Sequence, residues 1–177
     1  ALTGFPFLSG FYSKDAIIEF AYLKNSPLGN YAATVGIITA FMTSIYSWRL
    51  FFKTFHGEYN NKKIKIGDTH ESPIIMLLPL VFLGVGAIFS GYLFKETFIG
   101  HDSNQFWQSS IFFLNQIKHA DIPLWFLFIT PALVLLSIPI SFYLYIYNPK
   151  LVEDFKNTNL PLYEFLLNKW YIDDLYE

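Results

Sequence analysis

The 177-residue sequence contains no cysteine. Its absence excludes disulfides, thiolate nucleophiles, thiolate-bound iron–sulfur clusters and cysteine zinc sites, and it leaves the redox compartment undetermined. Charge is also sparse, since charged residues make up 15% of the chain, below the roughly 25% of typical soluble domains. The formal net charge of −2 and the lack of a basic stripe give no indication of nucleic-acid binding.

The sequence contains long apolar stretches without charged residues. Hydrophobic residues make up 53% of the sequence, and phenylalanine alone occurs 20 times. Residues 25–48, 72–94 and 122–149 contain no Asp, Glu, Lys or Arg. Each stretch exceeds the roughly 20 residues that a helix needs to cross about 30 Å of hydrocarbon. Three such stretches leave too little polar surface for a soluble globule, so the sequence predicts an all-α, polytopic membrane helix bundle.

The bundle is expected to form one membrane domain. We expect the second half of a broken transmembrane helix at the start, three full transmembrane helices after it, and a final segment on the cytoplasmic or matrix side. The chain has no initiator Met and no cap at its end, so it reads as a piece of a longer protein. The expected ranges are 1–24 for the broken helix, 31–52, 73–94 and 123–147 for the full helices, and 150–177 for the final segment.

Local residues support these boundaries. Ser72 and Pro73 predict an N-cap and a first helical residue, and Gly57 and the pair Asn148–Pro149 predict helix ends. Residues 103–117 fit either a short amphipathic helix at the interface or a plain connecting loop. Small residues four apart in the second full helix predict close approach of a neighbouring helix. These are Gly86 with Ser90 and Ala87 with Gly91.

The distribution of Lys and Arg orients the bundle. Because the helices alternate in direction, the loop after the first full helix and the tail after the third lie on one side. That side carries eight Lys and Arg residues against three on the other, with Lys14 set aside. The positive-inside rule places the richer side in the cytoplasm or matrix. The eight are Arg49, Lys53, Lys62, Lys63, Lys65, Lys150, Lys156 and Lys169, and the three are Lys24, Lys95 and Lys118.

Lys14 and Asp15 are the candidate site residues. They follow a glycine- and proline-rich break over residues 4–10, after which Ser13 is expected to cap a new helix whose first turn contains both. Ionisable groups at a helix break inside a membrane mark ion or proton sites in many transporters. Desolvation and the positive helix end disfavour the charged form of Lys14, and an anionic Asp15 partly offsets them. A lysine balanced in this way can gain and lose a proton when a neighbouring charge moves.

The pattern alone leaves a structural alternative open, in which Lys14 snorkels to headgroups beside a solvated partner. The other polar residues are weaker candidates. Hydroxyls in the first full helix could line a hydrated path or bond back to their own helix; they are Thr34, Thr39, Thr43, Ser44 and Ser47. Arg49 is expected to be an anchor, and His56, His70, His101 and His119 to be surface residues. Because His70–Glu71 lacks the second histidine of a zincin motif, no metal site is predicted.

The residues around the break carry a resemblance to a known family. Residues 2–6 and 10–19, which include Lys14 and Asp15, closely resemble the broken twelfth helix of the subunit 5 family of proton-pumping NADH:quinone oxidoreductase. These are the distal antiporter-like subunits of respiratory complex I. The resemblance covers essentially the whole chain and is most specific in its first 19 residues. Residues 43–49 with 55–57 look like the family's next helix, 70–73 like the start of the one after, and 169–176 like the approach to its long lateral helix.

The resemblance implies a proton-translocating membrane subunit that couples electron transfer from NADH to quinone with proton pumping. Lys14 falls on the family lysine proposed to be the terminal proton-transfer residue facing the outer side, and Asp15 on its acidic neighbour. The family's earlier relay groups are absent from this chain. The resemblance implies no cofactor or redox active site in the chain itself, with NADH, FMN, iron–sulfur clusters and quinone bound by other subunits.

The implied partners are the other membrane subunits of complex I, especially the neighbouring antiporter-like subunit, together with the lipid bilayer and protons. The implied location is multi-pass, in a bacterial inner membrane or the mitochondrial inner membrane. An alternative is the large subunit of a multisubunit cation/proton antiporter, which shares the broken-helix lysine. A long lateral helix beyond Glu177 would favour complex I. A third hypothesis, a scaffold without proton chemistry, would be preferred if Lys14 faced lipid.

Overall fold

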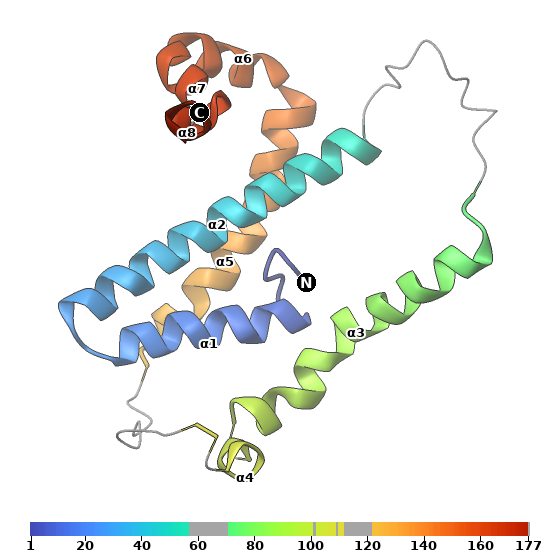
Figure 1. The fold of residues 1–177 in the computed structure, drawn as a ribbon, viewed down its shortest axis with the longest axis vertical. Helices are drawn as coiled ribbons and strands as arrows, with labels where there is room; N and C mark the ends of the chain where they lie inside the picture. The colour runs from blue at the N-terminus through green and yellow to red at the C-terminus, as the bar shows by residue number, and fades with distance from the viewer. Residues whose placement is uncertain (57–70, 101, 109, 112–121, 177) are drawn as a thin grey trace.

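The computed structural model describes residues 1–56, 71–100, 102–108, 110–111 and 122–176. Within these ranges the chain is helical and contains no strand (Figure 1). A π-helical turn, Tyr143–Tyr147, continues α5, and a short 3₁₀ turn, Lys169–Tyr171, precedes α8. The α-helices are α1 (Ser9–Leu23), α2 (Pro27–Phe55), α3 (Ile74–Phe98), α4 (Ser103–Trp107), α5 (Leu124–Phe142), α6 (Pro149–Thr158), α7 (Leu160–Leu167) and α8 (Ile172–Tyr176).

Three of the described helices have the length and hydropathy of membrane spans. They are Pro27–Phe55, Ile74–Phe98 and Leu124–Tyr147. Together with the all-helical architecture, they confirm the predicted class of a polytopic membrane helix bundle. α1 has 15 residues and is preceded by a non-helical segment, as expected for part of a broken helix.

The break before α1 differs in detail from the expected one. Residues 1–8 form turns, and both Gly4 (φ 74°) and Phe7 (φ 70°) have left-handed backbone conformations. α1 begins at Ser9, and the Ser13 hydroxyl donates to the Gly10 carbonyl inside the helix at 3.4 Å. Ser13 is therefore not the N-cap, and that expectation was wrong. As a result Lys14 lies in the second turn of α1, where the positive helix end acts on it less than expected.

The starts of α2 and α3 follow different rules. Ser26 caps α2 by accepting a hydrogen bond from the Gly29 amide at 3.0 Å, and Pro27 occupies the first helical position. This start signal lies before the expected residue 31, so α2 is longer than predicted. At α3 the N-cap is Pro73, without a side-chain cap bond from the described residues, so the predicted Ser72 cap is wrong. α3 also runs past residue 94 to Phe98, and it therefore contains Lys95.

The core of the bundle lies between α2 and α5, which run in the same direction. Ser44 and Ser137 are fully buried, and their hydroxyl oxygens are 2.6 Å apart. Because the Ser137 hydroxyl donates to the Val134 carbonyl at 2.6 Å, Ser44 is the donor between the two serines. Ser141 adds a contact to the Ile45 carbonyl at 3.5 Å. Small hydroxyls at this seam let the two helices approach closely while every buried oxygen is paired.

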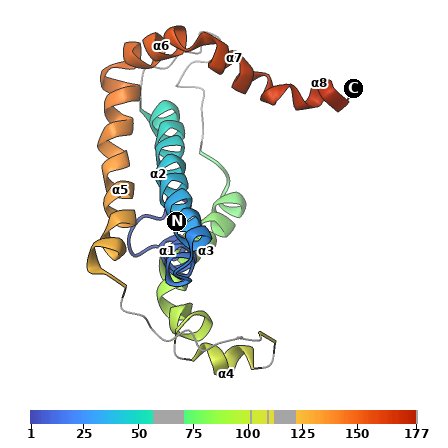
Figure 2. The ribbon, with the colours of Figure 1, turned by 90° about the vertical axis from the view of Figure 1, so that its left-hand side faces the viewer.

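α1 and α3 run opposite to α2 and α5, as the views in Figures 1 and 2 show. α1 forms a hairpin with α2 and packs on α5 through Tyr22, whose ring stacks on Phe126 with centroids 4.2 Å apart. α3 meets α1 at Gly91, where an added Cβ would lie 2.5 Å from the Ser9 Cα. Gly91 therefore provides the predicted close approach, whereas a Cβ at Gly86 would meet nothing within 4 Å in the described ranges.

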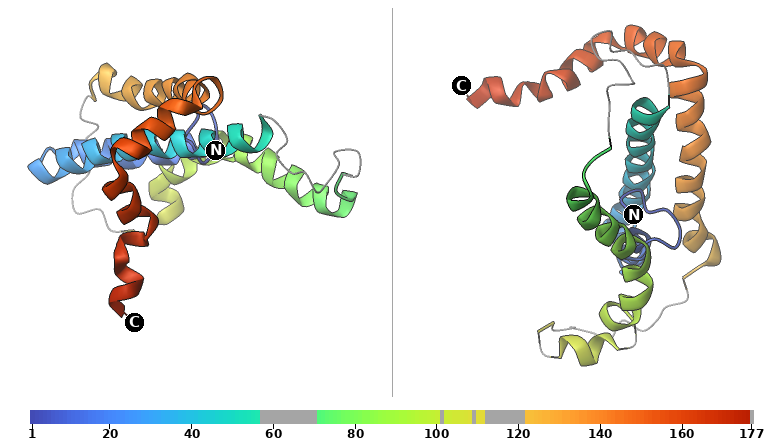
Figure 3. Two further views of the ribbon diagram at one scale, coloured as in Figure 1. Left: turned by 90° about the horizontal axis from the view of Figure 1, so that it is seen from above. Right: turned by 90° about the vertical axis from the view of Figure 1, so that its right-hand side faces the viewer.

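The described residues outside the spans include the short helices α4, α6, α7 and α8. α4 packs against the end of α3, since the Trp107 indole N–H donates to the Phe98 carbonyl at 3.1 Å. Residues 112–117 of the expected interfacial segment lie outside the described residues, as does Gly57. Asn148 ends the π turn and Pro149 begins α6. Figure 3 shows α6, α7 and α8 leading away from the end of α5, to one side of the bundle.

Candidate functional site

Lys14 lies where the unwound N-terminal segment folds back onto α1. Its ammonium group donates to the Leu2 carbonyl at 3.2 Å, an acceptor that is free because residues 1–8 are not helical. Gly4 is buried beneath the aliphatic stem of Lys14, and an added Cβ there would lie 3.3 Å from Lys14 Cδ. The break thus serves two purposes, since it supplies a backbone acceptor and leaves room for the lysine chain.

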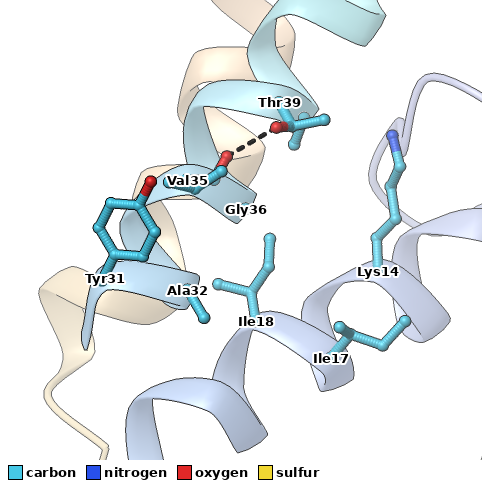
Figure 4. Close-up of a pocket in the computed structure, with 9 residues that line it drawn as sticks. Lys14, Ile17, Ile18, Tyr31, Ala32, Val35, Gly36 and Thr39 are labelled. Atoms are coloured by element: carbon cyan, nitrogen blue, oxygen red, sulfur yellow. Dashed lines mark hydrogen bonds between the residues drawn. The ribbon is translucent and has the colours of Figure 1, made fainter. Parts of the chain in front are cut away.

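A cavity of about 490 Å³ lies on the α2 side of Lys14. Figure 4 shows Ile18 of α1 pointing toward α2 at Gly36, with Lys14 extending along the side of the cavity. Ile18 packs against α2 at Gly36, where an added Cβ would lie 3.1 Å from Ile18 Cγ1. The residues that line this cavity are mainly apolar, and its polar side chains are Lys14 of α1 and Tyr31 and Thr39 of α2.

The α2 hydroxyls mostly bond within their own helix. Thr34, Thr39, Thr43 and Ser47 each donate to the carbonyl four residues earlier, at 2.6 to 2.8 Å. This arrangement matches the second of the two expectations for these residues, the bond back to the helix. Ser44 is different, because it pairs across the seam with Ser137. These hydroxyls therefore support the helix rather than form a row of free donors.

Asp15 does not face Lys14. Consecutive residues on a helix point about 100° apart, and Asp15 lines a different cavity, of about 530 Å³, between α1, α3 and α5. Within the described part of the chain no ion pair joins Lys14 and Asp15. Asp15 shares its cavity with Glu19 and with Lys95 of α3. The structure thus places the two predicted site residues side by side in sequence but in separate cavities.

Glu19 and Lys95 are the residues that the sequence reasoning missed. The spacing of four between Asp15 and Glu19 already places both carboxylates on one face of a helix. The helix expected over residues 73–94 leaves Lys95 outside it, because the apolar run ends at residue 94. The helix instead continues to Phe98 and brings Lys95 beside α1.

The other polar candidates lie away from the break. The Arg49 guanidinium lies over the Tyr145 ring, 5.5 Å from its centroid, and so ties α2 to the π turn that follows α5. This contact suits an anchor. His56 is exposed and packs beside Phe51 and Phe52. His70, His101 and His119 lie outside the described residues.

Known proteins match this chain over almost its entire length. NADH-ubiquinone oxidoreductase chain 5 of Phytophthora infestans is 41% identical over 182 residues, which cover 99% of the chain and 27% of that protein. The same subunit of Arabidopsis thaliana is 38% identical over 99% of the chain and 27% of its own length. That of Marchantia polymorpha is 48% identical over 64% of the chain and 17% of its length. The chain belongs to the NADH-ubiquinone oxidoreductase chain 5 family.

The chain spans about a quarter of the length of the Phytophthora and Arabidopsis proteins, 27% of each. No family model matches it. The similarity favours this family over the antiporter alternative. Membership together with three membrane-length helices makes the chain part of a multi-pass inner-membrane protein.

Proposed function

We propose that this chain is part of a proton-translocating membrane subunit that helps couple electron transfer from NADH to quinone with proton pumping. The similarity of 99% of the chain to proteins named NADH-ubiquinone oxidoreductase chain 5 supports the assignment. The observation that carries the chemistry is Lys14, a lysine held beside an unwound segment between membrane-length helices. A cation kept at such a place is costly unless it is used, because the bilayer interior disfavours charge.

In this proposal Lys14 is the proton-transfer group of the chain. Its ammonium form is stabilised by the Leu2 carbonyl, and its neutral form is favoured by the largely apolar cavity beside it. These two influences act in opposite directions on the balance between the protonation states. A change of charge elsewhere in the subunit can then protonate or deprotonate the amine.

Asp15 is proposed to act on this exchange from the neighbouring cavity. It makes no direct ion pair with Lys14 in the described ranges, so its influence is electrostatic and passes through the helix or through water. A carboxylate on the next residue, whose side chain points about 100° away around the helix, can still accept a proton released by the amine. Lys14 and Asp15 are therefore proposed to carry the proton one after the other, without forming a salt bridge.

The remaining assignments follow from the family. We propose that the redox cofactors NADH, FMN, iron–sulfur clusters and quinone are bound by other subunits, and that this chain has no redox active site of its own. Its partners would be other membrane subunits of complex I, especially the neighbouring antiporter-like subunit, and the lipid bilayer. The membrane would be the mitochondrial inner membrane or a bacterial inner membrane. The ends of α1 and α3 near Leu23 and Phe98 would face the outer side.

Lys14→Ala and Lys14→Met test the function in the intact complex. Vesicles carrying either variant should assemble the complex but show reduced proton pumping and reduced coupled NADH oxidation. Lys24→Met is the matched control, because Lys24 is an exposed lysine just after α1 that lines neither cavity. Normal pumping by an assembled Lys14 variant would overturn the proposed role.

A further inference from the structure

The cavity that holds Asp15 contains a second set of ionisable groups. Asp15 and Glu19 lie one turn apart on α1, and Lys95 reaches the same cavity from the last turn of α3. Two carboxylates and one ammonium group therefore line a single cavity. No direct ion pair joins them among the described residues. The groups thus form a spaced series rather than a closed salt bridge.

The series has a direction along the helix. Glu19 lies about 6 Å further along α1 than Asp15, toward the end at Leu23. α3 crosses α1 near its first turns, and Lys95 enters the cavity there, with its ammonium over the Tyr12 ring, 5.6 Å from the ring centroid. Asp15 and Glu19 therefore lead from the neighbourhood of Lys14 toward one membrane surface, and Lys95 reaches their cavity from α3.

α5 contributes a backbone feature to the same cavity. Pro131 lies inside α5 and lines the cavity together with Leu127, four residues earlier. Because proline has no amide hydrogen, it cannot donate to the Leu127 carbonyl as a normal helical residue would. Unsatisfied backbone groups at membrane depth are tolerated where they line a water-filled cavity. Water in this cavity would connect carboxylates that do not touch one another.

We propose that Glu19 is a further proton-transfer residue, which receives the proton from Asp15 and releases it at the outer end of α1, and that Lys95 positions this step. In the transfer, the Asp15 carboxylic acid loses its proton to the Glu19 carboxylate through water, so that Asp15 becomes an anion and Glu19 becomes neutral. Glu19 then gives the proton to outer water and is an anion again. No electrons move, and only O–H bonds form and break. The inference rests on the proposed function.

Lys95 acts through Glu19 and is therefore a positioning residue. A positive charge in the same cavity favours the Glu19 anion and so restores the acceptor after each release. A purely structural role for Lys95 is the competing explanation, since a lysine near the end of a span can also snorkel toward headgroups. The two explanations predict different proton pumping for Lys95→Arg and for the double variant Glu19→Gln with Lys95→Met.

Membrane vesicles with the intact complex distinguish them. Glu19→Gln, which keeps the size of the side chain, should lower proton pumping on the order of tenfold or more, as loss of a positioned proton-transfer group does. Lys95→Met should lower pumping less, and Lys95→Arg should retain most of it. The double variant Glu19→Gln with Lys95→Met should pump no worse than Glu19→Gln alone, because the lysine acts through the carboxylate. Lys24→Met should pump like the unaltered complex.

Each result bears on the inference. Full pumping by assembled Glu19→Gln would overturn it, and so would a double variant whose loss equals the product of the two single losses. Assembly is measured on the same vesicles by native electrophoresis, and Glu19→Asp, which keeps the carboxylate, should restore part of the pumping. Lys14→Met is measured in parallel. If Lys14→Met pumps normally, the proposed function fails; if it stops pumping while Glu19→Gln does not, only the inference about Glu19 fails.

Discussion

Gly4→Ala perturbs the break without removing any ionisable group. Gly4 has φ 74°, and it is buried against the stem of Lys14. A residue with a Cβ in the left-handed region costs roughly 1–2 kcal/mol. The added methyl would also lie 3.3 Å from Lys14 Cδ, so that the lysine chain must shift by a few tenths of an ångström. A cost of this size lowers the population of the native break by a factor of about 5–30.

Proton pumping per NADH oxidised is the assay, measured in vesicles with matched amounts of assembled complex. Because Lys14 reaches the Leu2 carbonyl across the segment that contains Gly4, Gly4→Ala should reduce pumping severalfold although every titratable group remains. Gly84→Ala is the control. An added Cβ at Gly84 meets nothing within 4 Å in the described ranges, and alanine in a helix interior is favoured over glycine by roughly 0.5–1 kcal/mol.

A third variant separates backbone conformation from side-chain volume. Asparagine visits the left-handed region more readily than alanine, so Gly4→Asn should pump better than Gly4→Ala although its side chain is larger. If Gly4→Ala pumps as well as Gly84→Ala, the unwound segment does not hold Lys14 in a functional geometry. If Gly4→Asn is the worse variant, crowding of Lys14 rather than the backbone conformation is the cause.

Two further predictions test the charge of Asp15 and the orientation of the bundle. Asp15→Asn should impair coupled turnover more than its small steric change warrants, whereas Asp15→Glu should retain more activity; full activity of both would refute a role for the charge. Because the chain has no cysteine, single cysteines in it can be labelled without background from the same polypeptide. Asn30→Cys and Asn104→Cys should react with a membrane-impermeant thiol reagent from outside, and Asn157→Cys only after the membrane is opened. The reverse pattern would put the end of α1 on the inner side. Gly29 is unsuitable for this labelling, since a Cβ there would lie 2.5 Å from the Ala21 carbonyl oxygen.

The sequence predicts the class of fold because the membrane imposes a simple rule. In a bilayer, long uncharged stretches are stable only as spanning helices. Three helices of membrane length in the described residues correspond to the three stretches. The exact ends are harder to predict. Charge marks where an apolar run stops, but a helix can continue past it, as α3 does from residue 94 to Phe98. Capping signals also mislead, since α1 begins at Ser9 without the Ser13 cap.

The candidate site could be predicted only in part. The glycine and proline content of residues 4–10 locates the break, and Lys14 stands out as an ionisable residue beside it. Adjacency in sequence suggested a pair with Asp15, but helical geometry turns the two side chains toward different cavities. Lys95 joins the site because α3 packs on α1 at Gly91. The local sequence does not predict which helices pack together.

Chemical replacement of the lysine tests the central claim, that a protonatable amine at position 14 carries protons. Lys14→Cys in the intact complex should abolish most pumping. Alkylation with bromoethylamine then gives S-aminoethylcysteine, which differs from lysine by sulfur in place of one methylene, and pumping should return. Bromoethanol gives a neutral side chain of the same length and should not restore it. The unaltered complex, treated in parallel, controls for other subunits. Equal recovery with both reagents, or normal pumping by Lys14→Cys before treatment, would contradict the account.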